Sequence, residues 1–136
     1  MKSTRPIAVV LVIAGLVALL IGGALLVAPA SFHSSSGIDL GGDVNLLNET
    51  RAPGASLVAM GSLMLLGVVV ERLRFVALVA AAVLYASYGV GRLASWAVDG
   101  TPHSTLVVAT GVELAIAAAA GWALASSRLE VEARRP

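Results

Sequence analysis

The sequence predicts an all-α protein, a membrane-spanning antiparallel four-helix bundle. Of its 136 residues, 58% are hydrophobic and only 12% are charged, whereas about 25% of a typical soluble domain is charged. A single core of this size cannot hide so much apolar surface from water. The apolar residues also fall into four long runs joined by short polar segments. The length fits one domain, residues 1–136.

Four segments are long enough to cross a bilayer, which takes about 20 mostly apolar residues in a helix. The predicted spans are residues 6–28, 53–70, 75–98 and 105–126. The first span has a basic start, as a signal peptide does. Its apolar run exceeds the roughly 7–15 residues of a signal peptide, so we expect a retained helix.

Residues 29–52 form the longest connection, which we expect to be an outer loop. Its second part, residues 44–52, contains no helix breaker and can extend the second helix outward, capped by Asp43. Pro53 would then lie inside that helix. Apolar side chains indicate that the loop lies on the membrane surface or lids the bundle. They are Phe32, Ile38, Leu40, Leu46 and Leu47.

The basic residues predict the orientation, because cytoplasmic loops carry an excess of Lys and Arg. Seven of the nine fall on the side that holds both termini and the turn between the second and third spans. They are Lys2, Arg5, Arg72, Arg74, Arg128, Arg134 and Arg135. We therefore expect both termini in the cytoplasm. The bias toward Arg, Ala, Val and Gly suggests a bacterial source, and so the bacterial plasma membrane.

Small residues predict close helix packing, since helices in lipid gain little from the hydrophobic effect when they associate. Gly15 and Gly22 lie seven residues apart on one face of the first span. Gly54 and Gly61 repeat this spacing in the second. Residues 117 and 121 form a further small pair in the fourth span. Each glycine lowers helix propensity, which favours a packing role over chance composition.

Two opposite charges lie inside the spans. A charge at the bilayer centre costs at least ~2.5–3.5 kcal/mol, so it usually has a partner. Arg92 is roughly 9 Å and Glu113 roughly 12 Å from the outer ends of the third and fourth spans, at 1.5 Å per residue. The two spans are consecutive and antiparallel. We therefore expect Arg92 and Glu113 to pair.

Further polar residues gather near the outer end. Arg92 belongs to a stripe with Trp96 and Asp99 at helical spacing, and Asn48, Glu49 and Arg51 sit just outside the second span. Two guanidiniums could bind a carboxylate or a phosphate through paired hydrogen bonds. The predicted ligand-binding residues are Asn48, Glu49, Arg51, Arg92, Trp96, Asp99 and Glu113.

Simpler interpretations remain open for the same residues. Arg92 can extend its charge to the interface, and Trp96 can be an interfacial anchor. The Arg92–Glu113 pair can be purely structural. We expect no metal site at His33 and His103, because no recognised ligand spacing is present. The chain has no cysteine and no catalytic or cofactor motif, which favours a non-enzymatic role without a cofactor.

Several short motifs, taken in order, resemble an uncharacterised bacterial family of small four-helix membrane proteins, a domain of unknown function. The motifs are residues 48–54 (NETRAPG), 91–95 (GRLAS) and 99–102 (DGTP), followed by a Glu in the last span. The resemblance covers nearly the whole chain and implies the fold but no activity. The resemblance implies that the family's motif residues correspond to five positions of this chain, namely Glu49, Arg51, Arg92, Asp99 and Glu113. Pro53 departs from the pattern, which leaves the start of the second helix open.

Three functions compete. The first is binding of a small amphiphile, lipid headgroup or anionic ligand in an outward-facing polar pocket. The second is an accessory subunit of a larger membrane complex, which the small size and the Gly/Ala faces favour. The third is a proton-coupled transporter or intramembrane enzyme that uses Glu113, although no internal repeat is visible. Membrane lipids are expected partners. The net charge of +1 argues against nucleic acid.

Overall fold

Four long helices make up most of the computed structural model, which describes the backbone of residues 4–132 and the side chains of residues 5–127. The long helices are α1 (Thr4–Val27), α3 (Val44–Val69), α4 (Arg74–Asp99) and α5 (Ser104–Glu132). A short helix, α2 (Pro29–Ser34), follows α1, and a 3₁₀ turn, η1 (Glu71–Leu73), precedes α4. This architecture confirms the predicted all-α four-helix bundle.

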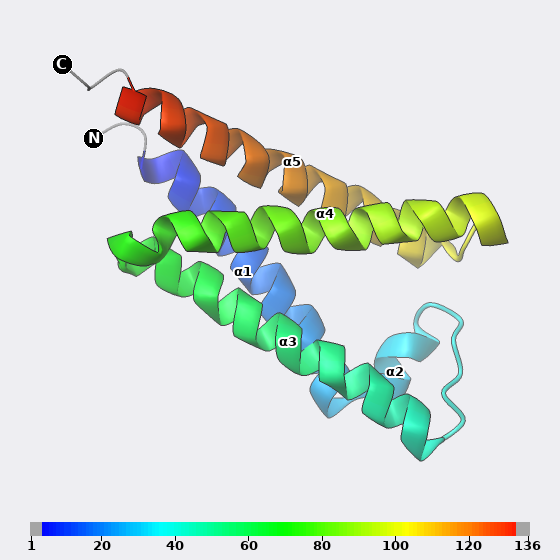
Figure 1. Ribbon diagram of the computed structural model, residues 1–136. Coiled ribbons are helices and arrows are strands. Elements are labelled where there is room, and N and C mark those ends of the chain that lie inside the picture. Colours follow the sequence, from blue (N-terminus) through cyan, green and yellow to red (C-terminus); the bar gives the residue numbers. More distant parts are fainter. Residues whose placement is uncertain (1–3, 133–136) are drawn as a thin grey trace.

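The bundle is antiparallel and has two distinct ends (Figure 1). The start of α1, the turn η1 and the end of α5 lie together, and we call this the terminal end. Helix α2, the segment that follows it and the α4–α5 connection lie at the opposite end, which we call the loop end.

All four long helices are long and apolar enough to cross a membrane, as in a multi-pass membrane protein. The qualifying stretches are Arg5–Val27, Val44–Val69, Glu71–Asp99 and Ser104–Ser127. The orientation stays a prediction. Four of its basic residues lie outside the described side chains, namely Lys2, Arg128, Arg134 and Arg135.

Helix α3 begins at Val44, which confirms the expected extension of the second helix through residues 44–52. The Asp43 carboxylate accepts hydrogen bonds from the backbone N–H groups of Asn45 and Leu46, which confirms the predicted N-cap. Pro53 lies inside the helix. Because proline has no N–H, the carbonyl of Glu49 loses its usual helical donor there.

Helices α1 and α3 pack through their glycines, along what we call the α1–α3 seam. A Cβ added to Gly15 would lie 3.0 Å from the carbonyl oxygen of Gly61, and one added to Gly22 would lie 2.6 Å from that of Gly54. In the reverse direction, a Cβ added to Gly61 would lie 2.8 Å from the carbonyl oxygen of Gly15, and one added to Gly54 would lie 3.1 Å from that of Gly22. The predicted packing role of these four glycines is confirmed.

Helices α4 and α5 make fewer such contacts. Gly89 packs against Leu114, where an added Cβ would come within 2.6 Å of its Cδ2. The prediction for Gly121 is wrong, because a Cβ there would meet no described atom of another helix within 4 Å. The reason is geometric: Gly121 lies on the exposed face of α5.

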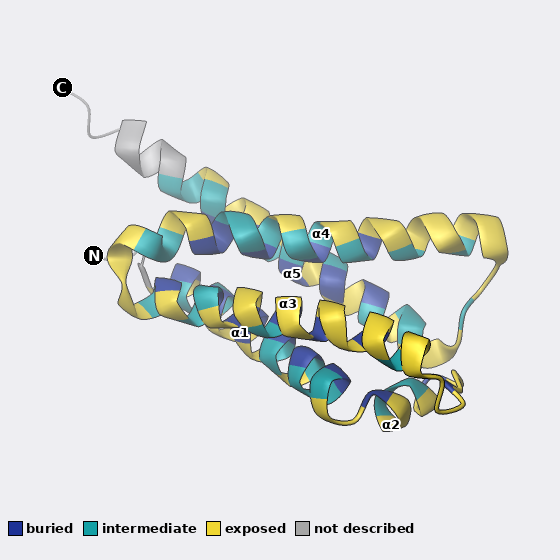
Figure 2. Cartoon of the chain, turned by 60° about the horizontal axis from the view of Figure 1, so that its bottom comes forward, coloured by how far each residue is buried: buried dark blue, intermediate teal, exposed yellow. Residues whose placement is uncertain are grey.

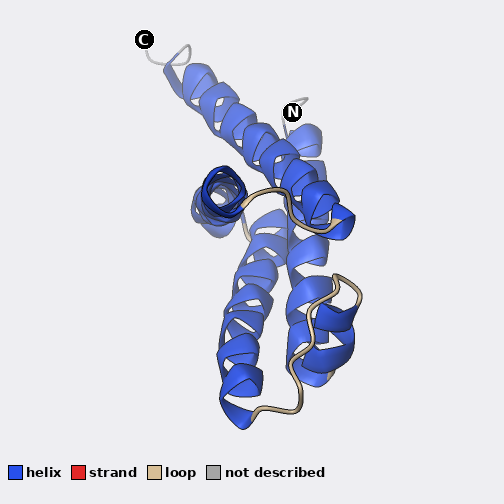
Figure 3. Cartoon of the chain, turned by 90° about the vertical axis from the view of Figure 1, so that its right-hand side faces the viewer, coloured by secondary structure: helices blue, strands red, loops and turns tan. Residues whose placement is uncertain are grey.

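The buried residues lie on the facing sides of the helices (Figure 2). Leu11, Met64 and Leu78 are the largest fully buried side chains, one each from α1, α3 and α4. Nearer the middle of α4, the Tyr85 hydroxyl donates a hydrogen bond of 2.6 Å to the carbonyl of Ala14 in α1. Beyond this level the α1–α3 pair diverges from α4 toward the loop end (Figures 1 and 3).

Candidate functional site

The divergence of the helices leaves a cavity of about 460 Å³ at the loop end. All four long helices contribute to its walls, and α2 and the segment that follows it line it at the loop end. Most wall residues are apolar. They include Ile21, Leu25, Phe32, Ile38, Leu40, Leu46, Leu57, Leu84, Leu106 and Ala109. The loop residues among them support the interpretation of residues 29–52 as a lid.

Arg92 of α4 and Glu113 of α5 form an ion pair in this wall. The Arg92 Nε–H group lies 2.9 Å from Glu113 Oε2 and 3.1 Å from Oε1. The Glu113 side chain is 9% exposed and that of Arg92 is 33% exposed. The predicted pairing is confirmed. The carboxylate is buried, while the guanidinium reaches from it toward a more open space.

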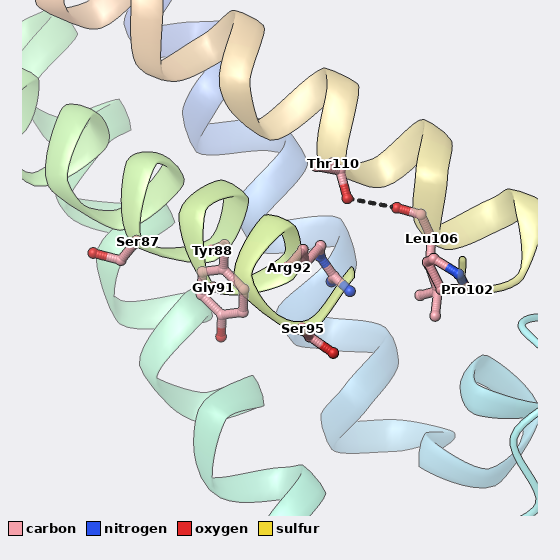
Figure 4. A pocket seen from close by; sticks show the side chains of 8 residues that line it. All are labelled: Ser87, Tyr88, Gly91, Arg92, Ser95, Pro102, Leu106 and Thr110. Atoms are coloured by element: carbon pink, nitrogen blue, oxygen red, sulfur yellow. Dashed lines mark hydrogen bonds between the residues drawn. The ribbon is translucent and has the colours of Figure 1, made fainter. Parts of the chain in front are cut away.

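The hydrogen bonds of Arg92 to described residues all leave from Nε. A guanidinium has four further N–H donors, on its two Nη atoms. Figure 4 shows Arg92 between α4 and the start of α5, with Tyr88 and Ser95 beside it on α4. The Nη groups of Arg92 can therefore donate hydrogen bonds to a bound group while Nε keeps its hydrogen bonds to Glu113.

A second hollow, a groove of about 500 Å³, adjoins the cavity along α4 and the start of α5 (Figure 4). Tyr88, Arg92 and Leu106 line both spaces and so form their boundary. We call this hollow the α4–α5 groove. Its remaining lining residues are Ser87, Gly91, Ser95, Pro102 and Thr110.

Of the predicted site residues, Glu49, Arg92 and Glu113 line the cavity. Arg51 does not. Its Nε–H group donates 3.1 Å to the carbonyl of Leu26, near the C-terminal end of α1. The last carbonyls of a helix lack internal partners, and a basic side chain satisfies one of them here. The expectation that the two arginines meet is therefore wrong.

Asn48, Trp96 and Asp99 also lie outside the residues that line the cavity or the groove. Asn48 is exposed on α3, and Trp96 is half-buried on α4. The Asp99 carboxylate accepts a hydrogen bond of 2.8 Å from the Ser95 hydroxyl one turn earlier on α4. These three positions share the loop end with the cavity but do not line it, although Asp99 contacts Ser95 of the groove.

The segment between α2 and α3 is held in place by short polar contacts. The Thr105 hydroxyl donates 3.3 Å to the carbonyl of Ser35 and so connects this segment to α5. Asp39 accepts a hydrogen bond from the N–H of Gly41, whose φ of +57° suits glycine. His103 contacts the Thr105 hydroxyl at 3.0 Å. Among residues 5–127, no group of three His, Cys, Asp or Glu side chains lies close enough to hold a metal ion.

Sequence reasoning missed several cavity residues, among them Thr50, Tyr88 and Thr105. Those on α3 carry a signal that could have been used. Leu46, Thr50, Pro53 and Leu57 follow one another at intervals of three and four, which places them on one helix face. The expected extension of the second helix through residues 44–52 was enough to show that face.

A family model described as a domain of unknown function (DUF4345) matches residues 7–124. The chain belongs to this family. Comparison with curated proteins found no match, and comparison with solved structures found none either. The match agrees with the resemblance drawn from residues 48–54, 91–95 and 99–102.

The DUF4345 match contains every residue that lines the cavity and the α4–α5 groove, from Ala18 to Glu113. The site thus belongs to the part of the chain that defines the family. The family description states no activity, so the function has to be argued from the geometry of the site.

Proposed function

We propose that this protein is an integral membrane protein that binds a small amphiphile in the loop-end cavity. In this proposal the headgroup contacts Arg92 and the apolar part lies against the cavity walls. One observation carries it: the described wall is mostly apolar, and its charged residues are the Arg92–Glu113 ion pair and Glu49. Ligand sites usually combine a largely apolar lining with a few polar groups that fix orientation.

The dimensions and the free donors support a ligand of modest size with an acidic or hydrogen-bond-accepting headgroup. The cavity volume of about 460 Å³ falls within the range of about 300–1,000 Å³ that is usual for small-molecule sites. The Arg92 Nη groups can form paired hydrogen bonds with a carboxylate or a phosphate. While the Nη groups bind the headgroup, Glu113 would still hold the guanidinium in place through its hydrogen bond with Nε.

The placement in the membrane is part of the same proposal. The excess of Lys and Arg at the terminal end supports both termini in the cytoplasm of a bacterial cell. The loop end and its cavity would then face outward across the plasma membrane. Reporter fusions at either terminus test this, and an active periplasmic reporter would contradict it.

Binding can be measured with cis-parinaric acid, a fatty acid whose fluorescence rises in an apolar site. We expect the purified protein to bind it and the double variant Arg92→Gln/Glu113→Gln to bind it much more weakly. That variant keeps neutral hydrogen-bonding groups of similar size in both positions. The matched control is Arg51→Gln, because Arg51 lies outside the cavity. Equal affinity of all three proteins would refute a headgroup site at Arg92.

A second candidate, an accessory subunit of a larger complex, is favoured by the free face of α5. Added Cβ atoms at Gly111 and Gly121 would meet no described atom within 4 Å, and Trp122 is 58% exposed. Such a face allows a helix of another chain to approach closely. Extraction in a mild detergent followed by partner identification tests this. A chain that runs alone, with no stoichiometric partner, would count against it.

A further inference from the structure

We infer that the ligand is a single-chain amphiphile taken from the membrane, which reaches the cavity sideways through the α4–α5 groove. This inference rests on the proposed function and adds to it the source and route of the ligand. The groove borders the cavity directly, because Tyr88, Arg92 and Leu106 line both spaces.

The position of the groove on α4 indicates the source. Ser87, Gly91 and Ser95 form its outer edge at intervals of four residues, and all three are exposed. They lie within a helix that is long and apolar enough to cross the membrane. The exposed face of such a helix borders lipid, so the groove opens to acyl chains along about two turns of α4.

The polar groups of the groove fit an amphiphile whose acyl chain carries one headgroup. The hydroxyls of Ser87 and Thr110 donate to the backbone carbonyls of Val83 and Leu106, within their own helices. These two hydroxyls therefore have no proton left to donate to a ligand, and the remaining groove surface is mainly apolar. Arg92 supplies the donors, at the boundary that a headgroup must pass on its way to the cavity.

At the loop end of the cavity, part of the lid packs against the bundle, while Ile38 and Leu46 stay exposed. Leu40 is buried, and Phe32 packs against the core of the bundle. The hydrogen bond between Thr105 and Ser35 ties the lid to α5. Together these contacts narrow the loop-end approach, and the groove along α4 and the start of α5 provides a second approach at the side of the bundle.

The cysteine-free chain allows a direct test with one reporter thiol at Ala109→Cys, which lines the cavity and not the groove. In lipid vesicles, we expect pyrene maleimide, which dissolves in the bilayer, to label this thiol. A charged methanethiosulfonate added to both faces of the vesicles should label it far more slowly. Adding Gly91→Leu, which fills the groove, should bring pyrene labelling close to that of the cysteine-free chain.

Gly111→Leu is the matched control, because Gly91 and Gly111 are both exposed helical glycines whose added Cβ meets nothing within 4 Å. Only Gly91 lines the groove. Labelling by the charged reagent at the same rate, or labelling that Gly91→Leu leaves unchanged, would overturn the lateral route. So would a thiol that neither reagent reaches. Each of these outcomes leaves the proposed binding site to the cis-parinaric acid measurement, which decides it separately.

Discussion

The two helix pairs of this bundle are built in different ways. Along the α1–α3 seam, four glycines bring the two backbones into contact, so that added Cβ atoms would collide with carbonyl oxygens. The α4–α5 pair has one tight glycine contact, between Gly89 and the side chain of Leu114, and an ion pair further along. Gly91, Gly111 and Gly121 all face open space.

The difference shows how one bundle can be closely packed on one side and open on the other. Helices in lipid associate through close packing and polar contacts rather than through the hydrophobic effect. The seam uses close packing and leaves no room between its helices. The α4–α5 pair relies more on a polar contact, which holds two helices together while leaving a groove and a cavity beside it. Three substitutions test this contrast.

The largest effect is expected from Arg92→Ala. Removal of one partner of a fully buried ion pair typically costs about 3–5 kcal/mol, and we expect the lower end of that range here because the Arg92 side chain is 33% exposed. Here Glu113 would remain buried in the cavity wall. Unfolding in mixed detergent micelles, titrated with dodecyl sulfate, measures the loss.

The double variant Arg92→Leu/Glu113→Leu provides the comparison, since it leaves neither group unpaired. We expect it to recover most of the lost stability, as apolar replacements of buried ion pairs often do. A double variant as unstable as Arg92→Ala would show that the α4–α5 pair does not depend on the ion pair in this way.

A smaller loss is expected from Gly22→Ala in the seam. The added methyl group would lie 2.6 Å from the carbonyl oxygen of Gly54, so the backbones must separate. Overpacking of this kind costs about 1–3 kcal/mol. The neighbouring substitution Gly23→Ala is the control, because a Cβ there meets nothing within 4 Å. The same micelle titration should show Gly23→Ala unchanged or slightly more stable, and equal losses in both variants would contradict the seam.

The smallest effect is expected at Tyr85→Phe, which removes the hydrogen bond between the two helix pairs. The Tyr85 hydroxyl donates to Ala14 from a buried position. A typical intramolecular hydrogen bond contributes about 1 kcal/mol. We expect a loss of that size in the micelle titration, with the helix content by circular dichroism unchanged. No loss at all would mean that the seam and the α4–α5 pair are joined by packing alone.

Much of the fold is predictable from local properties of the sequence. The four helices follow from the length and apolarity of four segments, and the cap at Asp43 follows from one side chain. The glycine spacing predicted the seam correctly, because a period of seven places two residues on one face of any helix. The same logic failed at Gly121, since periodicity does not tell which face of a helix receives a neighbour.

The candidate site was predictable only where position along the predicted spans decided the contact. Arg92 and Glu113 lie at matched depths on consecutive antiparallel helices, and they do meet. Arg51 was predicted at the correct end of the bundle, but its side chain donates to a carbonyl near the end of α1 and does not enter the cavity. Its direction depends on where α1 ends relative to α3, which no local pattern encodes.

The sequence by itself determined that four apolar helices form an antiparallel bundle and that one pair of opposite charges lies within it. The lengths of the apolar segments and the positions of the charges suffice for this, because each segment by itself must be long enough and apolar enough to form such a helix. Only the tertiary structure decided that α4 and α5 diverge from the seam, that a cavity opens beneath a packed lid, and that Arg92 lies between this cavity and a groove. These features depend on the angles between helices, which arise from many side-chain contacts acting together.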